Sequence, residues 1–335
     1  MESPSSFQPT LSSIPKVYVI HENEEWVQPL WDALEIQQIP FENWFIHEGG
    51  WDLTAEPPEG IFYNRMSASS HTRGHRYAVE LASPLIYWLE SHGRVVVNGA
   101  HTLLTEVSKV RQYLALNQAG LKTPRTYMAN NKDQLLAFAH NFGEDPFILK
   151  PNRGGKGLGV KLFHSVASLR AELDERKELE SLDGIFLLQD YIKPPKSEII
   201  RMEFIDGKFY YAVAVDTSEG FELCPADACE IDDLFCPTNS DEHIKPKFQI
   251  VENFENDDLP AIEKFLTEQK IDIAGIEYVE NEHGERFIYD INTNTNYNSE
   301  AEKATGYRWR GMDRIAKFLK EKFEVAYPPT LTQAS

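Results

Sequence analysis

Residues 271–296 read IDIAGIEYVENEHGERFIYDINTNTN, and this stretch decides the fold. Two apolar runs, Ile273–Val279 and Arg286–Ile291, flank the polar, glycine-containing segment Asn281–Gly284. Short apolar runs separated by such a segment are typical of two antiparallel strands joined by a turn. The stretch therefore predicts a β-hairpin.

Each strand of this hairpin carries a carboxylate where an apolar residue is expected, Glu277 in the first and Asp290 in the second. Asn292 follows Asp290 by two residues, so strand alternation places both side chains on one face. If the hairpin pairs in simple register about its turn, Glu277 approaches the same face. Two carboxylates and an amide oxygen suit a hard divalent cation such as Mg²⁺. A half-buried strand with polar edges is the alternative for the hairpin alone.

The composition is typical of a globular chain and argues against two classes of main partner, nucleic acids and anionic membranes. The chain has 335 residues, 41% of them apolar, and a formal net charge of −20. Nucleic acids and anionic membranes need basic surfaces, so neither is expected as the main partner. No apolar run approaches the roughly 20 residues of a membrane helix.

Three cysteines, an odd number, indicate a reducing cytoplasm rather than a disulfide framework. Free thiols are the expectation for Cys224, Cys229 and Cys236. A zinc site formed by them, with His243 as a fourth ligand, is the alternative, but their spacing matches no recognised zinc pattern.

The first part of the chain alternates short apolar strands with helices, which indicates a parallel sheet covered on both faces. We therefore predict an open α/β domain over residues 16–100. Its predicted strands are Lys16–Ile20, Phe41–Ile46, Gly60–Asn64 and Arg94–Asn98, and its helices are Glu24–Gln37 and Tyr77–Ser91.

A single helix is predicted at Thr102–Gly120, with Lys109 beside its apolar stripe. A β-α-β-β unit follows, formed by Arg125–Met128, Lys132–Asn141, Pro146–Lys150 and Gly159–Phe163. Beyond it we predict a helix at Ser165–Glu180, strands at Ile185–Ile192, 198–204 and 208–216, an irregular loop at Cys224–Gln249, and helices at Leu259–Gln269 and Gly311–Phe323.

Residues 151–160, PNRGGKGLGV, form a glycine-rich turn directly after Lys150. Glycines there leave backbone N–H groups uncovered and permit positive φ, which suits a cradle for phosphate oxygens. Lys150 would direct its ammonium group at the same phosphates. The segment is not a Walker loop, because a strand follows it and the GxxxxGK[ST] order is absent.

A cluster of cations follows the strand Gly60–Asn64, formed by Arg65, His71, Arg73 and His75. In open α/β sheets, ligands bind beyond the carboxyl ends of the strands. In a chain this acidic, the cluster favours an anionic ligand, either a carboxylate or a phosphate. An ordinary solvated loop is the alternative.

The order of these features resembles one known family. A lysine-bearing helix leads to Gly120-Leu121-x-x-Pro124, then come the strand ending in Lys150 and the glycine-rich hairpin, then Gln189-Asp190-Tyr191-Ile192, and last Glu277 and Asp290-x-Asn292. This order resembles the ATP-grasp superfamily of carboxylate–amine ligases, with the ribosomal-protein glutamate ligase branch as the closest type and D-alanine–D-alanine ligase as a more distant one. The resemblance covers roughly residues 100–322.

The resemblance implies an α/β (α+β) ATP-grasp architecture, in which two α+β subdomains hold ATP between them behind the N-terminal domain. We expect the central subdomain at 101–190 and the C-terminal subdomain, with the metal site, at 191–325. Residues 1–15 and 326–335 are expected to be tails.

Position by position, the resemblance implies roles for individual residues. Lys109 and Lys150 are similar to the two phosphate-binding lysines, and Glu198 to the acid that binds the ribose hydroxyls. Arg201 is similar to an arginine near the transferred phosphate and, with Lys150, is expected to be catalytic. The closing phosphate loop corresponds to Gly154, Gly155, Lys156, Gly157 and Gly159, the adenine hinge to Gln189, Asp190, Tyr191 and Ile192, and the magnesium ligands to Glu277, Asp290 and Asn292.

Two departures from the family pattern limit what transfers. Asp290 stands where the family more often has Glu, and the Asn-rich run that starts at Asn292 differs from the glutamate ligases, so their substrate does not carry over. The cationic cluster, together with Asn294 of the Asn-rich run, is our expected site for the carboxylate substrate.

The implied activity is an ATP-dependent ligation of a carboxylate and an amine, both small molecules, through an acyl phosphate. The implied cofactors are ATP and Mg²⁺, with Mn²⁺ as a substitute. A cytoplasmic location is expected, and a homo-oligomer is left open. The alternatives are an ATP-grasp kinase for a small hydroxyl substrate, which the acidity of the chain disfavours for polyphosphates, and a nucleotide-binding module without catalysis.

Overall fold

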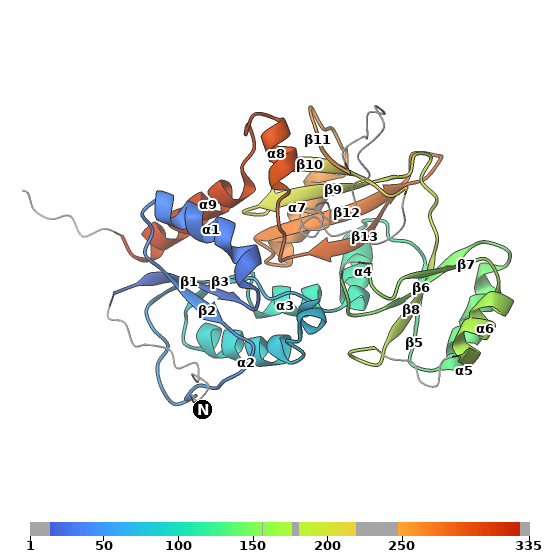
Figure 1. The fold of residues 1–335 in the computed structure, drawn as a ribbon, viewed down its shortest axis with the longest axis horizontal. Helices are drawn as coiled ribbons and strands as arrows, with labels where there is room; N and C mark the ends of the chain where they lie inside the picture. The colour runs from blue at the N-terminus through green and yellow to red at the C-terminus, as the bar shows by residue number, and fades with distance from the viewer. Residues whose placement is uncertain (1–13, 156, 176–180, 219–246, 329–335) are drawn as a thin grey trace, which may run out of the picture.

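The computed structural model describes residues 14–155, 157–175, 181–218 and 247–328. Within them the strands form three sheets, with the orders β2-β1-β3-β4, β5-β8-β6-β7 and β11-β10-β9-β12-β13. Figure 1 shows the first sheet at the left, the second at the right and the third above and between them. No helix in the described ranges is long and apolar enough to cross a membrane.

The first sheet is parallel throughout and is covered on both faces, as predicted. Strand alternation in β1 sends Val17 and Val19 to one apolar core and Tyr18 and Ile20 to another. Its strands are β1 (Lys16–His21), β2 (Phe41–Phe45), β3 (Gly60–Asn64) and β4 (Val95–Val97). Helix α2 (Ala78–Ser91) covers one face, and α1 (Glu24–Ile36) covers the other together with α9 (Gly311–Ala326).

The second sheet is antiparallel, and one of its faces packs against helices. Alternation in β6 buries Phe147 and Leu149 under those helices and turns Ile148 and Lys150 to the opposite face, towards a cavity. The strands are β5 (Thr126–Ala129), β6 (Phe147–Pro151), β7 (Lys161–Phe163) and β8 (Phe186–Asp190), and the helices are α5 (Lys132–Ala139), the short η2 (His140–Phe142) and α6 (Val166–Glu175).

The third sheet is antiparallel and carries the hairpin of residues 271–296. One face packs against helices α4 (Lys109–Gln118) and α7 (Leu259–Glu268), and the short α8 (Ser299–Ala304) contributes to a smaller cluster. Its strands are β9 (Glu198–Ile205), β10 (Lys208–Asp216), β11 (Phe248–Val251), β12 (Ile273–Glu280) and β13 (Arg286–Asn292). The sequence analysis did not predict β11 or α8.

The single helix predicted at Thr102–Gly120 is wrong, because the chain breaks it into α3 (Ala100–Glu106) and α4. Ser108 adopts an extended backbone, with φ of −146°, and its side chain caps α4 by accepting the N–H of Arg111. The break makes Lys109 the first residue of α4. The N–H of Lys109 donates to the carbonyl of Asn152, next to the glycine-rich turn.

The hairpin does not keep the simple register that was the condition for placing Glu277 near Asp290 and Asn292. From the turn, Glu280 pairs with Arg286 and Tyr278 with Ile288, but Glu277 then pairs with Asp290. Tyr289 is therefore an extra residue on β13, a β-bulge that re-aims the side chains beside it. Without the bulge, the observed pairing of Glu280 with Arg286 would have placed Tyr289, not Asp290, opposite Glu277.

Some predictions fall on residues outside the described ranges. Cys224, Cys229, Cys236 and His243, with most of the loop predicted at 224–249, lie there, as do Lys156 and the last five residues of the helix predicted at 165–180.

Candidate active site

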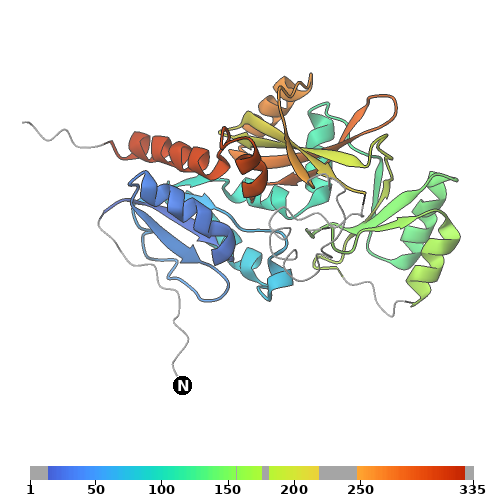
Figure 2. The same ribbon diagram turned by 45° about the horizontal axis from the view of Figure 1, so that its top comes forward.

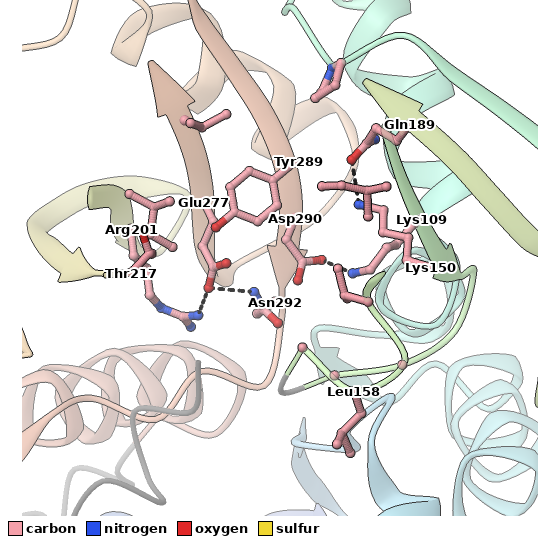
Figure 3. A pocket seen from close by; sticks show the side chains of 18 of the residues that line it. Lys109, Lys150, Leu158, Gln189, Arg201, Thr217, Glu277, Tyr289, Asp290 and Asn292 are labelled. Carbon is pink, nitrogen blue, oxygen red and sulfur yellow. Dashed lines mark hydrogen bonds and ion pairs between the residues drawn. The ribbon is translucent and has the colours of Figure 1, made fainter. Parts of the chain in front are cut away.

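A cavity of about 490 Å³ lies where the second and third sheets meet loops of the first domain. Seven lining residues come from strands of the third sheet, and Lys109, Lys150 and the glycine-rich turn face them (Figure 3). The polar lining includes Ser67, Ser69, Glu106, Lys109, Lys150, Gln189, Asp190, Ser197, Arg201, Thr217, Glu277, Tyr289, Asp290, Asn292, Asn294 and Asn296.

The hairpin places its two carboxylates side by side, and β9 and α4 give each of them a cationic partner. Arg201 Nη1 donates to Glu277 Oε1 at 2.7 Å, and Lys109 Nζ donates to Asp290 Oδ1 at 2.5 Å. Asn292 Nδ2 lies 3.4 Å from Glu277 Oε1. Burial raises the pKa of Glu277, and the positive charge of Arg201 opposes that rise. The three residues predicted as metal ligands therefore lie together.

Arg201 is buried and held from three sides. Its Nε donates to Glu203 at 2.6 Å, and its Nη2 donates to the Thr295 hydroxyl at 2.7 Å, in addition to the bond with Glu277. Burial disfavours the charge, but Glu203 and Glu277 outweigh it and raise the pKa of Arg201. Gly275 lies directly beneath the guanidinium, where a Cβ atom would overlap it.

Lys150 is buried on the other side of the cavity. Its Nζ donates to the Tyr113 hydroxyl at 2.6 Å and to Gln189 Oε1 at 2.8 Å. Burial, and next the charge of Lys109, lower the pKa of Lys150 to about 7. No carboxylate of the described residues forms an ion pair with Lys150, so this lysine is poised to gain from an anionic ligand.

The glycine-rich turn borders the cavity through Gly154, Gly155 and Gly157. Gly157 has φ of +72°, a value that an L side chain rarely adopts. A Cβ on Gly155 would lie 3.0 Å from the Cβ of Ser69 in the first domain. The turn thus packs closely against Ser69, in the loop that follows β3.

The segment predicted as an adenine hinge borders the cavity at Gln189, Asp190, Tyr191 and Ile192. The N–H of Asp190 donates to the carbonyl of Arg125 at 3.0 Å, and that of Tyr191 donates to the carbonyl of Pro146 at 3.2 Å. Nearby, Ser197 and Ile199 line the cavity, whereas Glu198 between them is not among its lining residues.

The cationic cluster does not present its charges to the cavity. Arg73 and His75 both pair with the buried carboxylate of Glu22, at 2.5 and 3.0 Å. Burial lowers the pKa of His71. The cavity lining from this loop is instead Ser67, Ala68 and Ser69.

Arg65 is 1% exposed and is not among the lining residues. Its side chain donates to the oxygens of Asn294 and Asn296 and to the carbonyl of Thr295. The loop thus meets the predicted substrate residue Asn294 through Arg65, behind the cavity wall.

The Asn-rich run alternates its side chains beyond the end of β13. Asn292, Asn294 and Asn296 line the cavity, while the threonines between them are buried. Thr293 donates both its N–H and its hydroxyl to Glu106, and Thr295 contacts Arg201 and Glu203. Sequence reasoning missed Glu106, although an acid beside the apolar residues of a helix was a signal for it.

The side-chain oxygens of Glu277, Asp290 and Asn292 suit a metal ion that also takes phosphate or water ligands. Among the described residues no group of three or more His, Cys, Asp or Glu side chains could hold a metal ion. The smaller set of Glu277, Asp290 and Asn292 matches the way Mg²⁺ binds, with one or two carboxylates and substrate phosphates. One oxygen of each carboxylate is paired with a cationic side chain in this structure.

The sequence comparisons match only part of the chain. A family model for a RimK-like ATP-grasp domain matches residues 107–221. A probable alpha-L-glutamate ligase of Teredinibacter turnerae is 28% identical over 131 residues, which are 39% of this chain and 42% of that protein. The chain therefore aligns with less than half the length of this relative.

Solved structures match nearly the whole chain at low identity. A RimK domain ATP-grasp protein from Sphaerobacter thermophilus is 16% identical with a TM-score of 0.61, over 90% of this chain and 98% of that one. The ATP-grasp ligase PsnB, complexed with a phosphomimetic variant of its minimal precursor, Mg and ADP, is 15% identical with a TM-score of 0.60, over 93% and 99%. Residues 107–221 are therefore a RimK-like ATP-grasp domain, and the chain as a whole has the ATP-grasp fold.

Proposed function

We propose that this chain is an ATP-dependent ligase that joins a carboxylate to an amine through an acyl phosphate, with release of ADP and phosphate. One observation carries the proposal: a single cavity brings together Lys109, Lys150 and Arg201 with the paired carboxylates of Glu277 and Asp290. The three cations, together with a metal held by the two carboxylates, would neutralise the charge of a triphosphate from several directions, which is the main requirement for phosphoryl transfer.

The nucleotide is assigned to the part of the cavity between the second and third sheets. The glycine-rich turn and the two lysines would hold its phosphates. Its base would lie against the segment Gln189–Ile192 and the apolar lining residues Ile148, Leu162 and Val279. For the ribose hydroxyls, Ser197 is a nearer candidate than Glu198, because Ser197 lines the cavity.

Glu277, Asp290 and Asn292 are the residues that would hold Mg²⁺. When bound, the metal would neutralise phosphate charge and orient the phosphates. We expect Mn²⁺ to substitute for it, because both ions accept oxygen ligands.

In the proposed reaction an oxygen of the substrate carboxylate attacks the γ-phosphorus, and the bond to the β,γ-bridging oxygen breaks as ADP leaves. The amine then attacks the acyl carbon, phosphate leaves with the electron pair of the C–O bond, and the amine loses a proton. The work of the protein is positioning and charge stabilisation. Arg201, held by Glu203 and Thr295, is placed to stabilise the phosphate that is transferred.

The test is ATP turnover by the purified protein with Mg²⁺ and pairs drawn from a panel of amino acids and dipeptides. We expect ADP and phosphate to form together with a product whose mass equals that of the two substrates minus water. Formation of ADP with a phosphorylated hydroxyl would instead establish a kinase. Binding of ATP without turnover on any pair would contradict the ligase proposal.

A further inference from the structure

Arg65 is a buried cation, and the partners of its side chain among the described residues are all neutral. It is 1% exposed, and its guanidinium donates to Asn294 Oδ1 at 3.1 Å, to the carbonyl of Thr295 at 3.2 Å and to Asn296 Oδ1 at 2.6 Å. Its remaining nitrogen lies 3.9 Å from the sulfur of Met312. No carboxylate of the described residues forms an ion pair with it. A buried charge without a counter-ion is costly, so its presence requires a reason.

The contacts of Arg65 determine how two asparagine side chains are turned. A guanidinium has donors and no acceptor, so it can bind only the oxygen of an amide group. The oxygens of Asn294 and Asn296 therefore face Arg65. Both asparagines also line the cavity, which leaves their N–H₂ groups as the donors available to a bound molecule.

We propose that Asn294 and Asn296 bind the carboxylate of the substrate that accepts the phosphoryl group, which we call the acceptor. Arg65 is then the positioning residue that orients both amides and supplies positive charge from behind them. This inference rests on the proposed function and names the binding group within that site. Arg65 does not touch the substrate in this arrangement. The positive charge of Arg65 would polarise the two amides and so stabilise the bound carboxylate, because the distance is short and the region is poorly solvated.

Other cations of the first domain are less suited to this role. Arg73 and His75 both contact Glu22 instead of the cavity. Glu106, which also lines this end of the cavity, is bonded to the N–H of Ala68 and to both donors of Thr293.

Asn294 follows the predicted metal ligand Asn292 by two residues on the same side of the run, so a carboxylate held here would lie beside the phosphates.

The first test exchanges each asparagine for the acid of the same shape. Asn294→Asp and Asn296→Asp replace the amide donors with oxygens, so a bound carboxylate would meet negative charge. For the substrate pair found in the ligase screen, the KM for the acceptor should rise about ten- to a hundredfold, while the KM for ATP stays unchanged. The matched control is Asn130→Asp, at an exposed position outside the cavity lining, and it should change neither value.

The second test does not require catalysis. Asn296→Asp would give Arg65 a carboxylate partner, so we expect a higher Tm of the ligand-free protein, whereas Asn130→Asp should not raise it. Calorimetric titration with each amino acid and dipeptide of the panel, and with its carboxamide, should show that the wild-type protein binds an acid more tightly than its amide. That preference should be lost in Asn296→Asp.

The outcomes separate this inference from the proposed function. If no pair supports turnover but the preference for the acid exists and disappears in Asn296→Asp, the ligase proposal fails and the carboxylate site stands. The site is wrong if the wild-type protein binds no acid in the panel, if it binds acid and amide alike, or if both Asp variants keep wild-type affinity. A rise in the ATP KM equal to that of the acceptor KM would also overturn it.

Discussion

Lys109 and Lys150 carry the same charge into the same cavity, but their surroundings differ. Lys109 pairs with Asp290, whereas Lys150 is buried between Tyr113 and Gln189. Burial, and next Lys109, lower the pKa of Lys150 to about 7, so at pH 8 most of this lysine is neutral in the free protein. Nucleotide phosphates would favour the charged form and raise that pKa.

We therefore predict that ATP binding at pH 8 takes up as much as about one proton per protein molecule through Lys150, and much less at pH 6, where the lysine is already charged. Calorimetric titration in two buffers with different ionisation enthalpies measures this uptake. Lys150→Met should abolish it and weaken ATP binding, while Lys320→Met, on α9, should do neither. Equal uptake by Lys150→Met and the wild-type protein would contradict the assignment.

The paired carboxylates lead to a second prediction at the scale of single residues. Glu277→Ala or Asp290→Ala should lower kcat by about a hundredfold or more, because each removes a ligand of the proposed metal, which would neutralise the phosphate charge. The circular dichroism spectrum should be unchanged. Glu282→Ala is a suitable control, since that side chain is 80% exposed in the turn of the same hairpin. Near-wild-type turnover in either of the first two variants would exclude the metal assignment.

For single residues, alternation along a strand predicted which side chains share a face, but the sequence did not predict that Arg65 is buried. Asp290 and Asn292 share a face because they are two residues apart on an extended chain, which the sequence already shows. The burial of Arg65 depends on Asn294 and Asn296, 229 and 231 residues further along the chain. A long-range contact of this kind leaves no local pattern in the sequence, so Arg65 was expected to contact the substrate directly.

At the scale of elements, Gly275 in β12 shows how a strand makes room for the site. Arg201 lies across it, and a Cβ there would overlap the guanidinium. Gly275→Ala should therefore displace Arg201 from Glu277, lower ATP turnover, and cost about 1–3 kcal/mol of unfolding free energy through overpacking. Denaturant unfolding measures the loss. Gly50→Ala, with no heavy atom within 4 Å of the added methyl, is the control, and an equal change in both variants would refute the argument.

The presence of a strand or helix was easier to predict than the bulges and breaks that position its side chains. Periodicity and turn residues locate β12 and β13 to within a residue or so, because the two apolar runs and the turn between them are local signals. The bulge at Tyr289 and the break at Ser108 are small departures that tertiary contacts select. They bring Asp290 opposite Glu277 and put Lys109 at a helix start, and both features matter to the site.

At the scale of the whole molecule, the alternation of strands and helices predicted the parallel first sheet, but not which helices cover it. Helix α9 lies almost 300 residues beyond β1, yet it packs beside α1 on that sheet (Figure 2). Its residues Ile315, Phe318 and Leu319 share one apolar core with Val17 of the first sheet and Ile273 of the third. An amphipathic helix shows in its sequence that it has an apolar face, but not which surface will cover that face.

This packing leads to the last prediction, which concerns the chain as a unit. Ending the chain at Arg310 removes α9 and uncovers apolar residues of both the first and the third sheet, so the loss should reach far beyond the deleted helix. We expect the truncated protein to lose cooperative thermal unfolding and to bind a dye specific for exposed apolar surface. A chain ending at Pro328 keeps all of α9 and should unfold as the full chain does. If the protein ending at Arg310 instead melts cooperatively within a few degrees of the full chain, α9 is an appendage, and the first sheet is stable without it.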